Sequence, residues 1–506
     1  MKKLMLAVAA VAACAVALAT THEVATVGEL METLNTKVVS GDEVVLTAAE
    51  YDFSAETPTS VSSTYGGGTS LAYIHVFDKS VTIRSASGDP KKCVLKGRGN
   101  FGDVADSGNT DYVDAKCMHL GRGSQTVKGI TFRNFYSSTE GGALLIGHAQ
   151  NTQTWNGTVN RVEDCVFENC ASSSKGGGAS LCGTFKPSNK NAYVYTHVRG
   201  CDFTNCWSKG TGAGLATADT AGYYTDVVDG NFTDLTAYTS NGGIVAGVCT
   251  NCVFTRCKNI PDNTANRNSG VGSASRWVNC KFFDNHAAWK QGVGGGTFIN
   301  CEFSGNTAYS ALCIAQSATF YNCIITNHTE NENLAIGPYY NCIIANNTSK
   351  KYLCGTGPLV NCLVMSNRFN GAVSGGWLTN TVFFGNIGLN NKVNCDFGQG
   401  KPHLYRCIWG GVTYSASYPN YPVECWTNTV PEVWNNMKFA GPAKHPKNPW
   451  APRRTSFMVG RGALDPALTN GEASVDIEGR PRVVGESVDL GPSEYEPSIG
   501  LMMLLR

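Results

Sequence analysis

Asn279–Asn285 (NCKFFDN) is the stretch that decides the fold, because it recurs almost unchanged as Asn300–Asn306 (NCEFSGN). Shorter copies begin at Asn251, Asn322, Asn341, Asn361 and Asn380, and looser copies begin at Gly129, Asp164 and Gly200. From Cys280 onward the steps between successive copies are 21, 22, 19, 20 and 19 residues. A step of this size holds about three short strands with their turns, so each copy is predicted to close one coil of a stack.

The spacing inside the repeat predicts which side chains face inward. Cys and Phe stand two positions apart, so in a strand they point to the same side. The residue between them varies freely, as Lys281 and Glu302 do, and is predicted to face solvent. The inward column of this ladder is predicted to contain Cys165, Cys201, Cys252, Cys280, Cys301, Cys323, Cys342 and Cys362.

A second column is expected five residues after the first. It holds Cys170, Cys206 and Cys257 in the early coils, and then Asn285, Asn306, His328, Asn347, Asn367 and Asn386. Asn at a bend tolerates left-handed backbone, and its amide can hydrogen-bond to the Asn of the next coil. We therefore predict a ladder of stacked asparagines at this position.

These features predict an all-β chain folded as a right-handed parallel β-helix, a solenoid of about a dozen coils. Leucine-rich repeats have a similar period but need a Leu-x-x-Leu-x-Leu pattern, which the chain lacks. The predicted organisation is an N-terminal cap and entry strand at 20–62, the β-helix at 63–410, and a separate C-terminal segment at 411–506 that closes the stack or serves in sorting. An amphipathic stretch at Val27–Leu34 is expected to cover the open N-terminal end.

The first 19 residues are typical of an export signal. Two lysines and the apolar run Leu4–Leu18 precede an A-x-A cleavage site that ends at Ala19. An alternative is a bacterial lipobox ending at Cys14, which would make that residue a lipidated anchor. No later stretch is long and apolar enough to span a bilayer. The protein is therefore expected to be secreted or displayed on the outer cell surface.

Charge excludes one large class of partners. The chain has 40 Lys and Arg against 39 Asp and Glu, and no basic stripe appears, so nucleic-acid binding is not expected. A net charge near zero also argues against ligand capture by electrostatics alone.

Three stretches resemble known families. Tyr73–Gly97 looks like the first coils of pectin-lyase-like β-helix proteins, and Gly141–Leu144 with the Phe-x-x-Asn copies resembles the repeats of polymorphic outer-membrane proteins. Asp476–Glu496, which reads D-x-x-G-x-P-R and then D-L-G, is similar to a closing segment of many secreted bacterial right-handed β-helix proteins. The resemblance implies the fold and export, but not a reaction, because this scaffold hosts lyases, hydrolases, esterases and adhesins.

The cysteines invite a disulfide interpretation, because the exported chain would keep 20 of its 21. In-register neighbours, however, have parallel Cβ vectors about 4.8 Å apart, beyond the ~3.8 Å typical of a disulfide. We therefore predict buried thiols that pack as small hydrophobes. Pairs such as Cys165 and Cys170 resemble zinc ligands in isolation, but their repetition at structural positions favours packing.

Signatures of the familiar enzymes on this scaffold are missing from the sequence. The Gly-His-Gly of polygalacturonases does not occur, and Asn394–Gly398 matches a pectin methylesterase motif only superficially. Pro452–Arg454 carries arginines, as pectate lyases do, but lies in the C-terminal segment away from the coils, so we interpret it as structural. No catalytic residue is assigned.

Two weaker signals concern ligands. Four carboxylates stand in a loop inserted before the regular coils, namely Asp103, Asp106, Asp111 and Asp114. They could bind calcium, which takes about 6–8 oxygens, although they meet no fixed ligand spacing and a solvated loop is the alternative. Trp277 and Trp289 lie close to Lys281 in sequence and would stack on a sugar ring if they faced outward, core packing being the other role.

The sequence leads us to expect a monomeric, non-catalytic β-helix protein that binds polysaccharide or a surface glycan along its long face and requires no cofactor. The alternatives are a polysaccharide lyase or glycoside hydrolase acting in a groove along the coils, and a structural component of the envelope or matrix. An enzyme needs two carboxylates, or a base beside a cation, on one face, whereas a binder needs only an aromatic or polar stripe. The outward side chains therefore decide between them.

Overall fold

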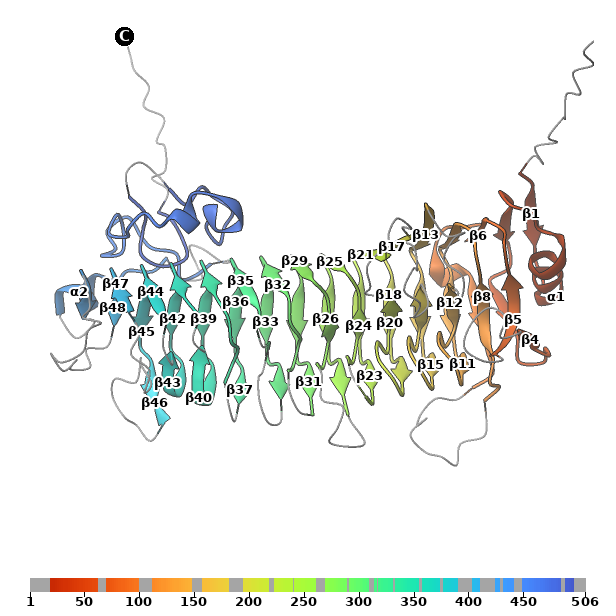
Figure 1. Cartoon of the computed structure of the whole chain (residues 1–506), viewed down its shortest axis with the longest axis horizontal. Coiled ribbons are helices and arrows are strands. Elements are labelled where there is room, and N and C mark those ends of the chain that lie inside the picture. The colour runs from red at the N-terminus through yellow and green to blue at the C-terminus, as the bar shows by residue number, and fades with distance from the viewer. Residues whose placement is uncertain are drawn as a thin grey trace, which may run out of the picture.

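The computed structural model describes residues 19–495 apart from 62–69, 100–111, 148–156, 182–193, 218–222, 240, 261–268, 289–290, 309–313, 316, 331–332, 355–356, 374–375, 390–402, 410–423, 428–430, 441–447 and 484–486. The described residues form an elongated stack of coils, with the first described residues (red) toward one end of the stack and the last (blue) toward the other (Figure 1).

Two sheets of 15 strands run the length of the stack. Sheet A consists, in spatial order, of β1 (Thr21–Val24), β2 (Glu43–Leu46), β6 (Val81–Ser85), β9 (Gln125–Lys128), β13 (Thr158–Glu163), β17 (Val194–Arg199), β21 (Tyr223–Val228), β25 (Val248–Thr250), β29 (Arg276–Val278), β32 (Thr297–Ile299), β35 (Thr319–Tyr321), β38 (Tyr339–Tyr340), β41 (Leu359–Val360), β44 (Trp377–Thr379) and β47 (His403–Tyr405). Sheet B consists of β3 (Glu50–Asp52), β7 (Val94–Lys96), β10 (Thr131–Arg133), β14 (Val166–Glu168), β18 (Asp202–Thr204), β22 (Asn231–Thr233), β26 (Val253–Thr255), β30 (Lys281–Phe283), β33 (Glu302–Ser304), β36 (Ile324–Thr326), β39 (Ile343–Ala345), β42 (Leu363–Met365), β45 (Val382–Phe384), β48 (Ile408–Trp409) and β49 (Trp426–Thr427).

Shorter sheets complete the coils. Sheet C consists of β4 (Thr59–Val61), β5 (Ser70–Val76), β8 (Lys116–Leu120), β12 (Leu144–Ile146), β16 (Ala179–Leu181), β20 (Leu215–Thr217), β24 (Ile244–Val245) and β28 (Gly272–Ser273). Sheet D consists of β11 (Tyr136–Ser137), β15 (Ala171–Ser172), β19 (Trp207–Ser208), β23 (Thr236–Ala237), β27 (Lys258–Asn259), β31 (His286–Ala287) and β34 (Thr307–Ala308). Sheet E consists of β37 (Thr329–Glu330), β40 (Thr348–Cys354), β43 (Arg368–Val373) and β46 (Ile387–Gly388).

The chain is a right-handed parallel β-helix, as the repeat predicts. Within the described residues every ladder between named strands is parallel except the pair β4–β5, and parallel crossovers are right-handed. Coils of about 20 residues contain three named strands, as expected, whereas the longer early coils add a fourth strand in sheet C. The stack is somewhat longer than the dozen coils that the sequence predicts, since sheets A and B each have 15 strands.

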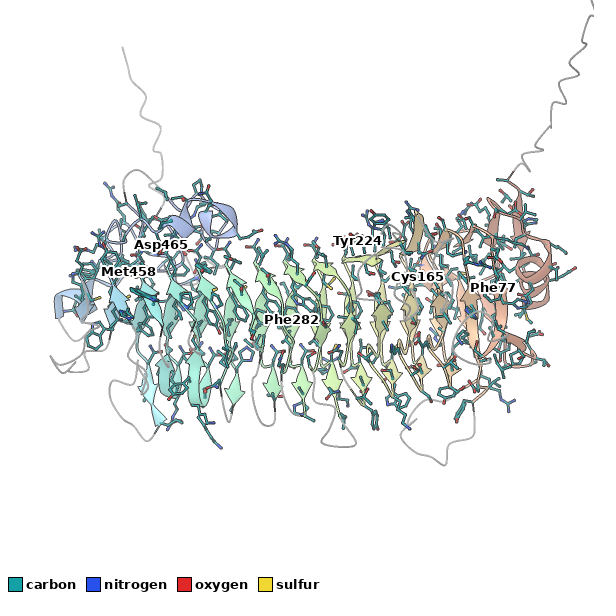
Figure 2. The ribbon with its side chains drawn as sticks, viewed as in Figure 1. Phe77, Cys165, Tyr224, Phe282, Met458 and Asp465 are labelled. Carbon is teal, nitrogen blue, oxygen red and sulfur yellow. The ribbon has the colours of Figure 1, made fainter. Side chains whose placement is uncertain are left out.

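The interior follows the parity of the repeat. The inward phenylalanines of sheet B stack in parallel, with ring centroids 4.8 Å apart for Phe167 and Phe203 and 4.9 Å apart for Phe282 and Phe303. Figure 2 shows Phe282 and Cys165 within the stack of coils. Trp277 is fully buried and stacks on Phe298, so core packing is confirmed as its role and it is not an outward sugar platform. Trp289 lies outside the described residues.

Both ends of the stack carry additional structure. At the N-terminal end, α1 (Val27–Glu32) begins with a capping box between Thr26 and Glu29, and its Leu30 is part of the core. A π-helical turn (Thr33–Lys37) follows, and a 3₁₀ turn (Pro90–Lys92) precedes β7. At the other end, the C-terminal lobe, defined as the described residues of 431–495, contains α2 (Pro431–Asn436) and two 3₁₀ turns (Pro466–Leu468 and Gly471–Ser474) and lies against the last coils (Figure 1).

Candidate functional site

The outer face of sheet A carries a concentration of aromatic and ionisable side chains on β13, β17 and β21. These three strands pair in register over six residues, β13 with β17 and β17 with β21. Alternate residues of a strand point outward, so three outward columns form. The columns read Val159–Tyr195–Tyr224, Arg161–His197–Asp226 and Glu163–Arg199–Val228. We call these nine residues the β13–β21 patch.

Two tyrosines provide a flat exposed surface in the patch. Tyr195 is 40% exposed and Tyr224 is 51% exposed, and their rings stack with centroids 5.3 Å apart and 18° between planes. Figure 2 shows Tyr224 on the edge of the stack, between the N-terminal coils and the C-terminal lobe. A cross-strand aromatic pair stabilises a sheet by roughly 0.2–1 kcal/mol, which explains the stacking. Half-exposed parallel rings also suit a ligand with a flat apolar face.

A histidine and an aspartate form the centre of the patch. His197 Nδ1 lies 2.5 Å from Asp226 Oδ1, and Arg199 Nη2 lies 3.9 Å from Asp226 Oδ2. The pairing follows from register, because His197 and Asp226 are direct partners on β17 and β21. The contact lacks hydrogen-bond geometry, because His197 Nδ1 finds no hydrogen-bond partner among the described residues. It is therefore an ion pair only when the imidazole is protonated, and Nε2 is left for acid–base work or ligand binding.

Most other charges of the patch are paired within the protein. Lys128, on β9 beside the patch, lies 3.1 Å from Glu163 and 3.5 Å from Asp164. Arg161 is exposed and forms no ion pair with any residue that the structure describes. The patch therefore offers one unpaired cation, Arg161. Its neighbours in the patch are the neutral tyrosines and charged side chains that are paired within the protein.

The two patch carboxylates are not direct cross-strand neighbours, and each lies close to a basic side chain, Glu163 to Lys128 and Asp226 to His197. Glu163 aligns with Arg199, which aligns with Val228, two residues beyond Asp226. The backbones of Glu163 and Asp226 are thus two strand spacings apart, roughly 10 Å, with a further two-residue offset. A base beside a cation, His197 with Arg199, is the arrangement that the patch does present.

The middle column of sheet A continues past the patch. From Asp226 it runs through Val248, Arg276, Thr297, Thr319, Pro338, Pro358, Trp377 and His403. The C-terminal lobe reaches this column at Arg276, which forms an ion pair with Glu472. The lobe otherwise covers the neighbouring outward column, where Tyr321, Tyr340 and Val360 pack against Leu468 and Val488 of the lobe.

The predicted ladder cysteines occupy one buried column. Cys165, Cys201, Cys252, Cys280, Cys301, Cys323, Cys342 and Cys362 are all buried and unpaired by disulfides. Their thiols donate to backbone carbonyls, as Cys201 Sγ does to Val162 O at 3.4 Å. Burial raises the pKa of the Cys201 and Cys323 thiols well above the ordinary value, so these groups are structural and not nucleophilic.

The asparagine column is buried and hydrogen-bonded along the axis. Asn285 Nδ2 donates to Asn306 Oδ1 at 2.8 Å, and Asn347 Nδ2 donates to Asn367 Oδ1 at 3.0 Å. Asn367 Nδ2 continues the ladder to Asn386 Oδ1 at 3.1 Å. The left-handed backbone that the sequence led us to expect at these residues lies one position earlier, for example at Asp284 (φ 53°) and Asn346 (φ 57°). His328 joins this column, and burial lowers its pKa to about 4, so it is neutral at ordinary pH.

The acidic loop is only partly visible. Asp103, Asp106 and Asp111 lie outside the described residues. Asp114 accepts a hydrogen bond from the backbone N–H of Ser138 at 2.7 Å. Across the described part of the chain, no group of three or more His, Cys, Asp or Glu side chains is arranged to hold a metal ion.

A buried amine lies close to Asp114. Lys116 is fully buried on β8, and its Nζ donates to Thr139 Oγ1 at 2.8 Å. Burial lowers the pKa of Lys116 to about 8, while Asp114 and Glu140 act in the opposite direction. The Lys116 amine satisfies buried polar groups at the corner between sheets C and D and is not accessible to a ligand.

The predicted export residues give little structural information. Cys14 lies outside the described residues, and Ala19 is exposed just before β1. In the portion of the chain that is described, no helix has both the length and the hydropathy to cross a membrane.

Sequence reasoning missed the β13–β21 patch, although a signal was present. Arg161, His197 and Asp226 stand four residues before Cys165, Cys201 and Gly230, the first residues of three successive repeats. Aligning the outward positions, and not only the inward cysteines, brings these polar residues into one column. The candidate site is therefore found among the varying, outward residues of the repeat, which carry no fold information.

Three of the solved structures to which this chain is similar are lyases. The pectate lyase Pel9A matches 94% of this chain and 96% of its own at 11% identity and a TM-score of 0.30. A mannuronic acid specific polysaccharide family 6 lyase from human gut microbiota matches 82% of this chain and 94% of its own at 12% identity and a TM-score of 0.32. The PL6 family alginate lyase AlyGC matches 72% and 71% at 9% identity and a TM-score of 0.29. No protein-family model and no curated protein matches the chain. At these values the likeness is one of fold alone, and no residue of this chain takes a role from these enzymes.

Proposed function

We propose that the chain is an exported β-helix protein that binds a polysaccharide or surface glycan on the β13–β21 patch without turning it over. The observation that carries the proposal is the stacked, half-exposed pair Tyr195 and Tyr224. Sugar rings present flat C–H faces that pack on aromatic rings, and the polar residues beside the tyrosines can bind hydroxyl groups.

The charges of the patch support binding that tolerates salt. His197 with Asp226 and Lys128 with Glu163 are compensated inside the protein, so little of the binding free energy would come from screened long-range attraction. Arg161 is the exception and favours a carboxylate-bearing glycan to a modest degree. Stacking and hydrogen bonds would supply the remaining affinity.

Export is the second part of the proposal. It rests on the charged and apolar leader that ends at Ala19, with lipidation at Cys14 as the alternative. Mass spectrometry of the protein from culture medium and from membranes tests it. A chain that begins at Thr20 and is found in the medium supports ordinary signal cleavage. A membrane-bound chain that begins with a lipid-modified Cys14 would instead support the lipid-anchored alternative.

A second candidate function is β-elimination of a uronate polysaccharide, favoured by the His197–Asp226 pair beside Arg199. His197 Nε2 would take the proton next to the uronate carboxylate, whose charge Arg199 would offset. The electron pair left behind forms a carbon–carbon double bond as the glycosidic C–O bond breaks, and the leaving oxygen takes up a proton. The product is an unsaturated sugar that absorbs ultraviolet light.

One experiment separates the two candidates. The purified protein is incubated with acidic and neutral polysaccharides, with and without calcium, and retention in affinity gels, ultraviolet absorbance and reducing ends are recorded. Retention without products supports binding. Unsaturated products overturn that proposal in favour of elimination, and the absence of both retention and products with every glycan contradicts both candidates. Calcium-dependent products would point to the loop of Asp103, Asp106, Asp111 and Asp114.

A further inference from the structure

A second aromatic surface lies on the same column of sheet A. Trp377 is 64% exposed, the highest value among the large exposed hydrophobic residues, and its ring stacks on His403 with centroids 4.1 Å apart and 10° between planes. Tyr405, 36% exposed, follows on the same strand as His403. A largely exposed tryptophan held flat on a neighbouring ring presents a rigid aromatic surface to a ligand.

The two aromatic surfaces are collinear. Trp377 aligns with Asp226 through the successive ladders of sheet A, and seven strand steps separate β21 from β44. At the usual strand spacing the two surfaces are roughly 34 Å apart. Most residues of the middle column between them have short or flat side chains. These are Thr297, Thr319, Pro338 and Pro358, which are all half-buried.

The C-terminal lobe lines one side of this column without covering its end. Lobe residues pack over Tyr321, Tyr340 and Val360 in the adjacent column, and Glu472 pairs with Arg276. Trp377 nevertheless keeps 64% of its surface exposed. The lobe therefore limits sideways movement of anything that lies along the column and leaves the column itself open at Trp377.

We propose that Trp377 with His403 forms a second glycan subsite, and that one extended polysaccharide chain lies along the middle column and contacts both this subsite and the β13–β21 patch. The inference rests on the proposed glycan-binding function and adds the length of the ligand. Two sites joined by one ligand bind it with an avidity that can exceed either single affinity by roughly 10²–10⁴-fold. Short oligosaccharides would gain nothing from the second site and would occupy both sites separately.

Titration calorimetry with trisaccharides and polymers of galacturonate and of β-1,4-glucan tests the proposal. The wild-type chain is expected to bind two trisaccharides, and Trp377→Ala and Tyr224→Ala one each. The polymer is expected to bind at least roughly 10²-fold more tightly than the trisaccharide, and Trp377→Ala should remove that gain. Trp377→Phe should keep most of the gain in polymer affinity. The control Ile387→Ala removes another exposed apolar side chain (54%), on sheet E, and should change neither the stoichiometry nor the polymer affinity.

The outcomes distinguish this inference from the function on which it rests. If Trp377→Ala leaves both stoichiometry and polymer affinity unchanged while Tyr224→Ala weakens binding, the second subsite is wrong and the patch remains. If Tyr224→Ala has no effect, or if neither polymer binds the wild-type chain, the proposed function fails as well. Circular dichroism of each variant confirms that the coils are intact.

Discussion

At the scale of single residues, the inward phenylalanines show how one repeated position builds the core. Phe282 is fully buried between Phe254 and Phe303, at centroid distances of 5.3 Å and 4.9 Å. Backbone hydrogen bonds fix the spacing of the coils, so neighbouring coils cannot move together to fill a gap. A lost ring therefore leaves a cavity as well as losing its transfer free energy.

Phe282→Ala is expected to lower the free energy of unfolding by about 3–5 kcal/mol. The matched control is Phe283→Ala, the next residue of β30, which faces outward and is only half-buried. Its cost should stay below about 1 kcal/mol. Urea unfolding of both variants measures the difference, and equal effects would show that the parity of the repeat is misassigned.

The thiols are expected to be free and protected. All 17 described cysteines are unpaired, and Cys425 alone among them is not fully buried. Hydrogen bonding to the Cys407 thiol lowers the pKa of Cys425. With a thiol reagent on the native protein, Cys425 should react first and the ladder cysteines only after denaturation. Mass spectrometry that instead finds the ladder oxidised in pairs would refute the geometric argument against disulfides.

Sequence reasoning reached the core but not the site, for a physical reason. Inward positions such as Cys280 and Phe282 face the same environment in each coil, so they repeat and can be recognised. Outward positions face solvent, the lobe or a ligand, so His197 and Asp226 resemble nothing in neighbouring repeats. The fourth strand of the early coils was missed because β12 and β16 are only three residues long and follow Gly-rich turns.

At the scale of elements, the closing sequence folds into a compact electrostatic unit. The buried Asp476 carboxylate accepts hydrogen bonds from the backbone N–H groups of Glu478, Arg480 and Glu494, each at 2.9 Å. Arg482, also fully buried, pairs with Glu494 at 3.1 Å. The spacing of charges inside this segment is thus explained by its own folding and needs no ligand.

The lobe covers a surface that the coils alone would expose. The outward column of sheet B is polar at Asp202, Lys281 and Glu302, but later coils place Leu363, Val382 and Ile408 there. These three residues are fully buried against the lobe, where Met458 and Leu490 contribute to the same cluster. Figure 2 shows Met458 over the last coils. The lobe is therefore a structural requirement of the last coils.

Docking of the lobe should weaken as the pH rises from about 4.5 to 7. Burial raises the pKa of Glu494 from its ordinary value to about 7, with Arg482 acting in the opposite direction. The folded state thus binds this proton more tightly than the unfolded state, and its stabilising contribution is complete below the ordinary pKa and is lost as the pH rises to about 7. Burial shifts the pKa of Asp489 in the same direction.

Hydrogen exchange of lobe amides across this pH range, corrected for intrinsic exchange, measures the effect. Glu494→Gln, which cannot ionise, should flatten the dependence. Glu302→Gln, which changes a half-exposed carboxylate of sheet B that pairs with Lys281, should leave it unchanged. Lobe protection that increases with pH in the wild-type chain would contradict the prediction.

At the scale of the whole molecule, both ends of a long rod are occupied and one face remains available. The N-terminal cap covers the first coils, and the C-terminal lobe covers the corner between sheets A and B at the last coils (Figure 1). Between them the outer face of sheet A carries the exposed tyrosines, the His197–Asp226 pair and the unpaired Arg161. An extended face of a repeat protein suits an extended ligand.

The central claim is that this face binds a glycan through Tyr195 and Tyr224 without turnover. Affinity electrophoresis in gels containing polygalacturonate or a β-1,4-glucan, at low and high salt, tests this claim most directly. The proteins compared are the wild-type chain, the double variant Tyr195→Ala/Tyr224→Ala and the control Ile260→Ala. The control removes another exposed apolar side chain (40%). We predict that the wild-type chain and the control are retained at low and high salt, and that no sample forms product. The double variant should lose at least roughly tenfold in affinity, because two aromatic anchors of about 1 kcal/mol or more are removed. Equal retention of wild type and double variant, or accumulation of unsaturated sugar with the wild-type chain, would contradict the account.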